Sequence, residues 1–217
     1  MGNIDSATLI VIVLTVGTSL LGFSNREIFE RLKFNVNDIL RYNQWDRLIT
    51  SALLHGDWMH LLFNMLTLYF FSDVVISTLG RNIYILIYIA AILCGNLLSL
   101  WMHKKNSYYS AIGASGGVSG ILFASIALYP HLELIILPIP IPIPGWLFGV
   151  GYIAYSIYAM KKMQDNIGHE AHLGGATIGL LLAIAIQPRT LEYNGLYIAI
   201  MCIPLLVLAY LAYKEKK

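Results

Sequence analysis

The sequence predicts an all-α, polytopic membrane protein, and three observations lead to this fold class. Of the 217 residues, 58% are hydrophobic and only 12% are charged, which is far from the balance of a soluble domain. The apolar residues fall into helix-length runs, and about 17–25 such residues suffice to cross a bilayer. Polar or proline-rich stretches separate the runs. We therefore expect one integral membrane domain over residues 1–217.

Seven runs are candidate membrane spans, and in chain order they cover about 6–23, 57–78, 83–102, 115–129, 146–160, 170–187 and 196–213. The first run has no small-residue cleavage site before charged sequence begins at Arg26, so we interpret it as a retained span and not as a signal peptide. The segment 24–54 is too charged to span. Its mixture of apolar and charged residues predicts short amphipathic helices at the membrane interface.

The segments between the later runs are turns and loops. A turn at 80–82 separates the second and third spans, and polar loops at 103–107 and 161–168 precede the fourth and the sixth. Alternate prolines from Pro138 to Pro144 cannot stay helical, so they predict a stiff extended connector. Pro188 and Arg189 end the sixth span, and the charged tail 214–217 ends the seventh.

Charge and cysteine content exclude several functions. Fourteen Lys and Arg against twelve Asp and Glu give a net charge of +2, which leaves no basic surface for nucleic acid. Cys94 and Cys202 both lie in apolar runs, so they indicate neither a disulfide framework nor a metal cluster. The lipid bilayer is the partner that the composition predicts.

Polar groups at the starts of three spans are candidates for chemistry. Ser115 opens the fourth span among small residues, and His172 lies at the start of the sixth. A serine and a histidine on two helices can form a nucleophile and its base. His60 and Asn64, four residues apart on the second span, share a helix face and can donate hydrogen bonds to a developing negative charge. With alternating topology, these three starts lie on one side of the membrane.

Each feature alone also has a structural explanation. A Gly-x-Ser-Gly string reflects close helix packing about nine times in ten, and Gly175 with Gly179 forms a small-residue packing face whatever the function. His60 with Asn64 is about equally well explained as an interhelical hydrogen-bonding pair. The combination of the serine, the histidine and the donor pair favours a catalytic site.

At these residues the sequence resembles the rhomboid family of intramembrane serine proteases, over about 6–187. The family motif Gly-x-Ser-Gly matches 113–116, Ala-His with small residues three and seven places later matches the stretch from Ala171, and His-x-x-x-Asn matches 60–64. A further histidine, an arginine eight residues before it and a helix-ending glycine match His55, Arg47 and Gly80.

Three positions depart from the family pattern. Ser119 stands four places after Ser115, where the family usually has an aromatic residue against which the histidine ring stacks. Asp46 separates Trp45 from an arginine that is usually adjacent to it. Ile76 stands where a glutamate is expected, with Asp73 one turn earlier. Another group must therefore orient His172, or its geometry is looser than in the family.

The resemblance implies a fold and a mechanism. The fold is a six-helix bundle over 6–187 with an additional C-terminal helix over 196–213. The mechanism is a Ser115–His172 dyad without a third acid, which cleaves transmembrane protein substrates at unwound peptide bonds and needs no metal or cofactor. The oxyanion is held by His60, Asn64 and the backbone N–H of Ser115. The supporting residues are His55, Arg47, Gly113, Gly116, Gly175 and Gly179.

Other classes of membrane protein agree less well with these residues. A catalytically inactive rhomboid-like scaffold that binds membrane proteins is the main alternative, and the presence of both Ser115 and His172 argues against it. A zinc protease needs His-Glu-x-x-His, whereas His169 and His172 are three apart. An aspartyl protease needs two aspartates in spans, and only Asp73 lies in one. The absence of an internal repeat weakens a transporter interpretation.

The family resemblance and the distribution of Lys and Arg predict opposite orientations of the chain in the membrane. The family's topology in a bacterial-type cell membrane places the N-terminus inside and the active site towards the extracytoplasmic side. Only Arg81 and Arg189 are then cytosolic and the other twelve Lys and Arg lie outside, opposite to the positive-inside rule. Five of the twelve lie in the segment 24–54, where a folded insertion would weaken the rule.

Overall fold

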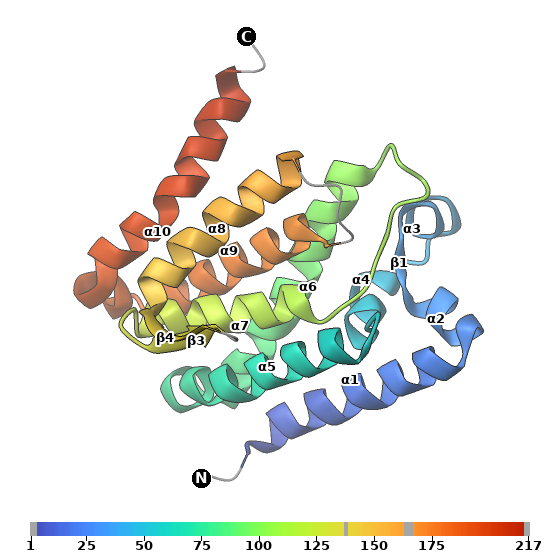
Figure 1. Ribbon diagram of the computed structural model, residues 1–217, viewed down its shortest axis with the longest axis horizontal. Helices are drawn as coiled ribbons and strands as arrows, with labels where there is room; N and C mark the ends of the chain where they lie inside the picture. The colour runs from blue at the N-terminus through green and yellow to red at the C-terminus, as the bar shows by residue number, and fades with distance from the viewer. Residues whose placement is uncertain (1–3, 137–138, 163–166, 215–217) are drawn as a thin grey trace.

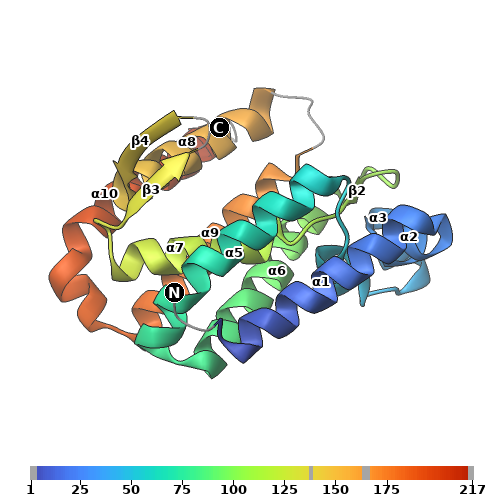
Figure 2. The same ribbon diagram turned by 60° about the horizontal axis from the view of Figure 1, so that its bottom comes forward.

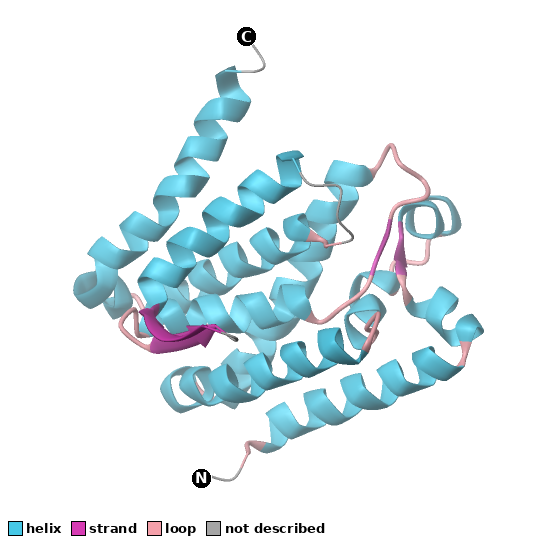
Figure 3. Ribbon diagram, in the orientation of Figure 1, coloured by secondary structure: helices cyan, strands magenta, loops and turns pink. Residues whose placement is uncertain are grey.

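The computed structural model describes residues 4–136, 139–162 and 167–214, and most of them are helical (Figure 3). The helices are α1 (Ser6–Ser24), α2 (Arg26–Leu32), α3 (Val36–Tyr42), α4 (Arg47–Thr50), α5 (Trp58–Leu79), α6 (Arg81–His103), α7 (Ser115–Leu128), α8 (Gly145–Lys162), α9 (His169–Ile186) and α10 (Arg189–Lys214). A 3-10 turn, Ser51–Leu53, precedes α5. Two antiparallel strand pairs join β1 (Phe34–Asn35) to β2 (Ser110–Ala111) and β3 (Glu133–Ile136) to β4 (Ile139–Pro144). The predicted all-α class is confirmed.

Helix α7 lies at the centre of the bundle (Figure 1). Every residue from Gly116 to Leu128 is buried, and α6, α7 and α9 form the most closely packed group. Helix α5 packs on another side of α7, α1 lies outside α5, and α8 and α10 lie together on the opposite side of the bundle (Figures 1 and 2).

Five described helices are long and apolar enough to cross a membrane: α1, α5, α6, α9 and the part of α10 from Arg189 to Val207. Helix α7 has only 14 residues. Its length of about 21 Å is shorter than a hydrocarbon core of about 30 Å. If the C-terminal end of α7 reaches one membrane interface, its N-terminal end lies below the opposite membrane surface. Ser115, the first residue of α7, is then at membrane depth.

The predicted spans match α1, α5, α6, α7, α8 and α9 to within about two residues at each end. The expected start of the seventh span at 196 is wrong, because α10 already begins at Arg189. Proline is favourable just before or within the first helical turn, where no N–H is needed. The backbone N–H groups of Thr190 and Leu191 bond to the carbonyls of Gln187 and Pro188, so the chain turns directly from α9 into α10.

The segment 24–54 forms the expected short helices. The Asn25 side chain accepts hydrogen bonds from the N–H groups of Glu27 and Ile28, which caps α2, and Asn35 caps α3 in the same way. The pairing of β1 with β2 ties this segment to the chain that leads into α7. A small apolar cluster beneath it contains Phe34, Val36, Ile39, Leu48 and Leu100.

The proline-rich connector is extended, as expected, but it is also one strand of a hairpin, which was not predicted (Figure 2). Strand β4 carries prolines at every second residue, 140, 142 and 144. Successive backbone N–H groups of a strand point to opposite edges, so these prolines remove donors from one edge only and the other edge can pair. Residues 138, 163–166 and 215–217 of the expected connector, loop and tail lie outside the described residues.

Glycines allow α7 and α9 to touch along their backbones. A Cβ on Gly175 would collide with the carbonyl oxygen of Gly116, and one on Gly179 would collide with that of Gly120. This is the small-residue contact that the sequence predicts. A Cβ on Gly95 of α6 would likewise lie 2.5 Å from the carbonyl oxygen of Ala171. The three helices are therefore in backbone contact within one turn of His172.

Candidate active site

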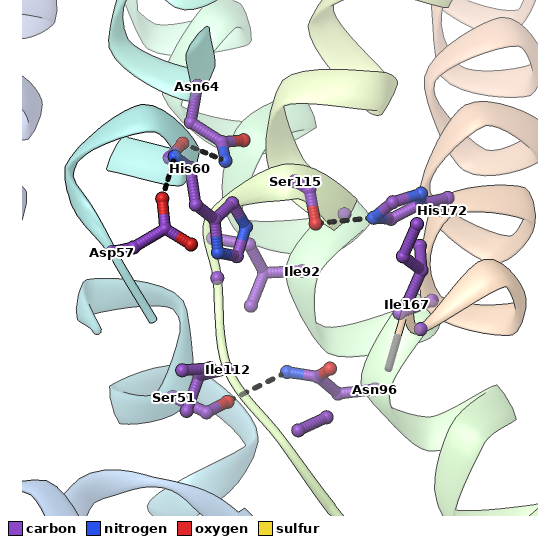
Figure 4. Close-up of a pocket in the computed structure, with 15 residues that line it drawn as sticks. Ser51, Asp57, His60, Asn64, Ile92, Asn96, Ile112, Ser115, Ile167 and His172 are labelled. Carbon is purple, nitrogen blue, oxygen red and sulfur yellow. Dashed lines mark hydrogen bonds between the residues drawn. The ribbon is translucent and has the colours of Figure 1, made fainter. Parts of the chain in front are cut away.

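Ser115 and His172 meet in a cavity of about 430 Å³ (Figure 4). Ser115 is the first residue of α7 and His172 lies in the first turn of α9. The Ser115 Oγ and the His172 Nε2 are 2.5 Å apart, which is hydrogen-bond distance. The cavity walls also carry polar groups from α5, α6 and the turn before α5: Ser51, Asp57, His60, Asn64 and Asn96.

His60 lies across the cavity from His172 (Figure 4), and Gly113 is close to both His60 and Ser115. Gly113 has φ +122°, which disfavours other residues. A Cβ there would lie 2.8 Å from the His60 Nε2 and 3.6 Å from the Ser115 Oγ. Gly113 is therefore required by its backbone conformation and by the space between these two side chains.

The orientation of His60 and Asn64 follows from the first turns of α5. The Asp57 side chain accepts a hydrogen bond from the His60 N–H at 2.8 Å, which caps the helix. The Gly56 N–H donates to the His60 Nδ1 at 3.5 Å, and the Asn64 Nδ2 donates to the His60 carbonyl at 2.9 Å. An amide nitrogen has two N–H groups, so this bond uses one of them.

His55 is fully buried behind His60, with the two ring centroids 4.8 Å apart. Burial lowers the pKa of His55 to about 3, so the ring is neutral near pH 7. Its Nε2 accepts a hydrogen bond from the Ala114 N–H at 3.4 Å, which leaves the proton on Nδ1 for the Ser19 Oγ at 3.0 Å. The Ser19 hydroxyl in turn donates to the Leu53 carbonyl. His55 thus links α1, the turn before α5 and the residue before Ser115.

Arg47 lies away from the cavity and holds the segment 24–54 together. Its buried guanidinium pairs with Asp38 at 2.8 Å. It also donates to the carbonyls of Glu30 and Lys33 and to the Gln44 side chain at 2.6–2.8 Å. The inserted Asp46 pairs instead with Arg31 at 2.7 Å.

A buried acid between His169 and His172, for which the sequence predicts no role, lies close to the site. Glu170, two residues before His172, accepts hydrogen bonds from the Tyr109 hydroxyl and from His103, whose Nε2 is 2.7 Å away. The His103 and Tyr109 rings are stacked with centroids 3.6 Å apart. Burial and the Glu170 carboxylate raise the pKa of Tyr109, so the phenol remains a donor. This cluster joins the end of α6, the loop before α7 and the first turn of α9.

Two further side chains near the site were missed. The Asn96 Nδ2 donates to the Leu48 carbonyl at 2.8 Å and to the Ser51 Oγ at 3.2 Å, on the cavity wall. The ring of Tyr152, from α8, stacks near His172. An amide in the middle of an apolar run marks Asn96 in the sequence, but nothing distinguishes Tyr152 from the other tyrosines.

Comparisons with known proteins identify the family. Residues 42–189 match the family model described as Rhomboid domain. Rhomboid protein 1, mitochondrial, of Saccharomyces cerevisiae is 30% identical over 138 residues, which are 62% of this chain and 40% of that protein. RHOMBOID-like protein 12, mitochondrial, of Arabidopsis thaliana is 32% identical over 149 residues, 62% of this chain and 44% of that protein.

Rhomboid protease AarA of Providencia stuartii is 27% identical over 194 residues, 80% of this chain and 68% of that protein. The chain thus spans less than half of the length of the two mitochondrial relatives and about two thirds of the bacterial one. The family model covers more than half of the chain, including both helix starts that meet in the cavity. This multi-pass membrane protein therefore belongs to the rhomboid family.

Proposed function

We propose that this chain is an intramembrane serine endopeptidase that cleaves peptide bonds in or near transmembrane segments of other membrane proteins. The observation that carries the proposal is the 2.5 Å contact between the Ser115 Oγ and the His172 Nε2 inside a polar cavity. Its relative in Providencia stuartii is named a rhomboid protease, which supports the same activity.

In the proposed mechanism His172 is the general base and then the general acid. The neutral imidazole accepts the Ser115 proton at Nε2 while Oγ attacks the substrate carbonyl carbon. The tetrahedral intermediate collapses as His172 gives that proton to the leaving amine, and an acyl-enzyme ester forms. Water, activated by the same imidazole, then attacks the ester and releases Ser115.

The negative oxygen of the intermediate needs donors that are already in place. The Gly56 N–H occupies the His60 Nδ1, so a neutral His60 carries its proton on Nε2, the atom that lies against Gly113. Asn64 offers its second N–H. The backbone N–H of Ser115 lies at the start of α7, where the helix dipole is positive. We assign the oxyanion to these three donors.

The substrate must present an extended peptide bond, because the carbonyls of an intact helix are used in its own hydrogen bonds. We propose that it is a membrane segment weakened by Gly, Pro or polar residues and, from the family resemblance, with a small residue before the cut. We further propose a bacterial-type cell membrane with the cavity towards the extracytoplasmic side. Reporter fusions after Leu54 and Lys217 test this orientation. The proposal predicts an extracytoplasmic reporter at both sites, and cytosolic reporters would reverse it.

The test of the activity is cleavage of a model transmembrane substrate by the purified protein in liposomes. We expect the wild type to cut, a fluorophosphonate to inhibit it, and a chelator to have no effect. Ser115→Ala and His172→Ala should fold and insert but not cut. If the wild type binds the substrate without cutting it, the chain is an inactive scaffold and the proposal is wrong. Cleavage by Ser115→Ala would show that another group is the nucleophile.

A further inference from the structure

The structure contains an aromatic ring beside His172 that comes from a different helix than the family pattern implies. Ser119, one turn after Ser115 on α7, cannot stack on an imidazole. Its Oγ is instead 2.8 Å from the hydroxyl of Tyr152 on α8. The Tyr152 ring lies 6.5 Å from the His172 ring, centroid to centroid, with an angle of 25° between the planes. Aromatic pairs at about 4.5–7 Å in offset, nearly parallel arrangements attract each other.

Neighbouring groups fix the position of the Tyr152 ring. Phe123 of α7 and Phe148 of α8 contact it with centroid distances of 5.4 and 5.7 Å. The hydroxyl–hydroxyl bond to Ser119 sets how far the ring reaches along α7. A ring held on two sides and at its tip presents a fixed face to the imidazole.

Helix α8 is itself held from outside by α10. Met201 of α10 is fully buried and lies against Gly149 of α8, one turn before Tyr152. A Cβ on Gly149 would lie 2.6 Å from the Met201 sulfur, so the glycine permits this close approach. The helix beyond the six-helix core therefore supports the helix that carries Tyr152.

We infer that Tyr152 is a positioning residue for His172, an inference that rests on the proposed function of the Ser115–His172 pair. The imidazole must keep its Nε2 towards Ser115, and a rotation about its χ2 angle would break that contact. Stacking against the fixed face of Tyr152 opposes this rotation. Ser119 then acts indirectly: its hydroxyl is too short to touch the base, but it anchors the ring that does.

The activity test compares four variants in the liposome cleavage assay, of which Ser119→Ala removes the hydroxyl that bonds to Tyr152. Tyr152→Leu removes the ring, Tyr152→Phe keeps the ring and removes the hydroxyl, and Tyr158→Leu removes an exposed tyrosine from the same helix as a control. Since a misplacement of about 1 Å can cost on the order of a hundredfold in rate, we expect Tyr152→Leu to lower kcat by about ten- to a hundredfold with KM nearly unchanged. Tyr152→Phe and Ser119→Ala lose one hydrogen bond and should stay within about tenfold of the wild type. Tyr158→Leu should match the wild type.

A ring swap separates positioning from general packing. Ser119→Tyr alone overfills the space beside Tyr152 and should reduce kcat. Combined with Tyr152→Ala, it supplies the ring from α7 and should recover at least a tenth of the wild-type kcat, well above either single variant. A purely structural role for Tyr152 predicts no such recovery.

Wild-type kcat in folded Tyr152→Leu, or a double variant no better than its parents, would overturn the inference. A crystal structure of Tyr152→Leu gives a readout that does not depend on activity. We expect the His172 ring to have turned away from Ser115, and an unchanged ring would overturn the inference. Absence of cleavage by the wild type would instead overturn the proposed function. Failure of the inference on Tyr152 and failure of the proposed function are therefore distinguishable.

Discussion

Replacing Gly175 by alanine should move His172 away from Ser115. The added Cβ would collide with the carbonyl oxygen of Gly116, which is backbone and cannot rotate aside. Restoring ordinary van der Waals contact requires α7 and α9 to separate by about 1 Å or more. Gly175 lies one turn from His172, so the 2.5 Å contact with Ser115 would lengthen to about 3.5 Å, beyond hydrogen-bond distance.

We expect Gly175→Ala to lower kcat by about a hundredfold and stability by about 1–3 kcal/mol. The assay is liposome cleavage, with thermal unfolding of the same preparations. Gly151→Ala on α8 is the matched control, because a Cβ there meets no atom within 4 Å. It should keep full activity and gain up to about 1 kcal/mol from the better helix propensity of alanine. Wild-type kcat in Gly175→Ala, or an equal loss in Gly151→Ala, would refute the packing argument.

Three further predictions concern the proposed oxyanion donors and the residues that support the segment 24–54 and the turn before α5. Asn64→Ala and His60→Ala should each lower kcat by up to about a hundred- to a thousandfold with little change in KM, and wild-type turnover in either would show that it is not a donor. Arg47→Ala should lower the free energy of unfolding by about 3 kcal/mol, because Asp38 and the carbonyl groups that Arg47 bonds lose their partner. The matched control Arg31→Ala removes an exposed ion pair and should cost under about 1 kcal/mol. Similar losses for the two variants in urea unfolding would contradict this. The pKa of His55 is lowered in the fold to about 3, so the unfolded chain takes up a proton first as the pH falls. The stability contributed by the neutral ring is therefore present above about pH 6.5 and is lost towards pH 3, by about 1.4 kcal/mol per pH unit. In unfolding curves measured over this pH range, His55→Asn should remove that slope.

The helices and the Ser115–His172 juxtaposition are the parts that local sequence could predict. Apolar run lengths predict the spans directly, and small residues beside Ser115 and after His172 indicate where two helices approach closely. Gly113 was predicted from the motif alone, and the structure adds its physical reasons, a positive φ and the His60 ring.

The missed features depend on tertiary contacts. Tyr152 is one of 14 tyrosines, and its place beside His172 depends on how α8 is rotated against α7 and α9. The hairpin needs the stretch Glu133–Ile136 as a partner, and that stretch has no turn or strand motif of its own. Local sequence predicts no role for Glu170, because its partners come from the end of α6 and from the following loop.

Mapping a fluorophosphonate adduct by mass spectrometry is the sharpest test of whether His172 activates Ser115. The reagent reacts with a serine only where a base and donors activate it, so it reports on the assembled site without a known substrate. We expect one adduct in the folded wild type, on the peptide that contains Ser115, and none there in His172→Ala. An adduct on a different serine, or equal labelling of Ser115 when His172 is absent, would contradict it.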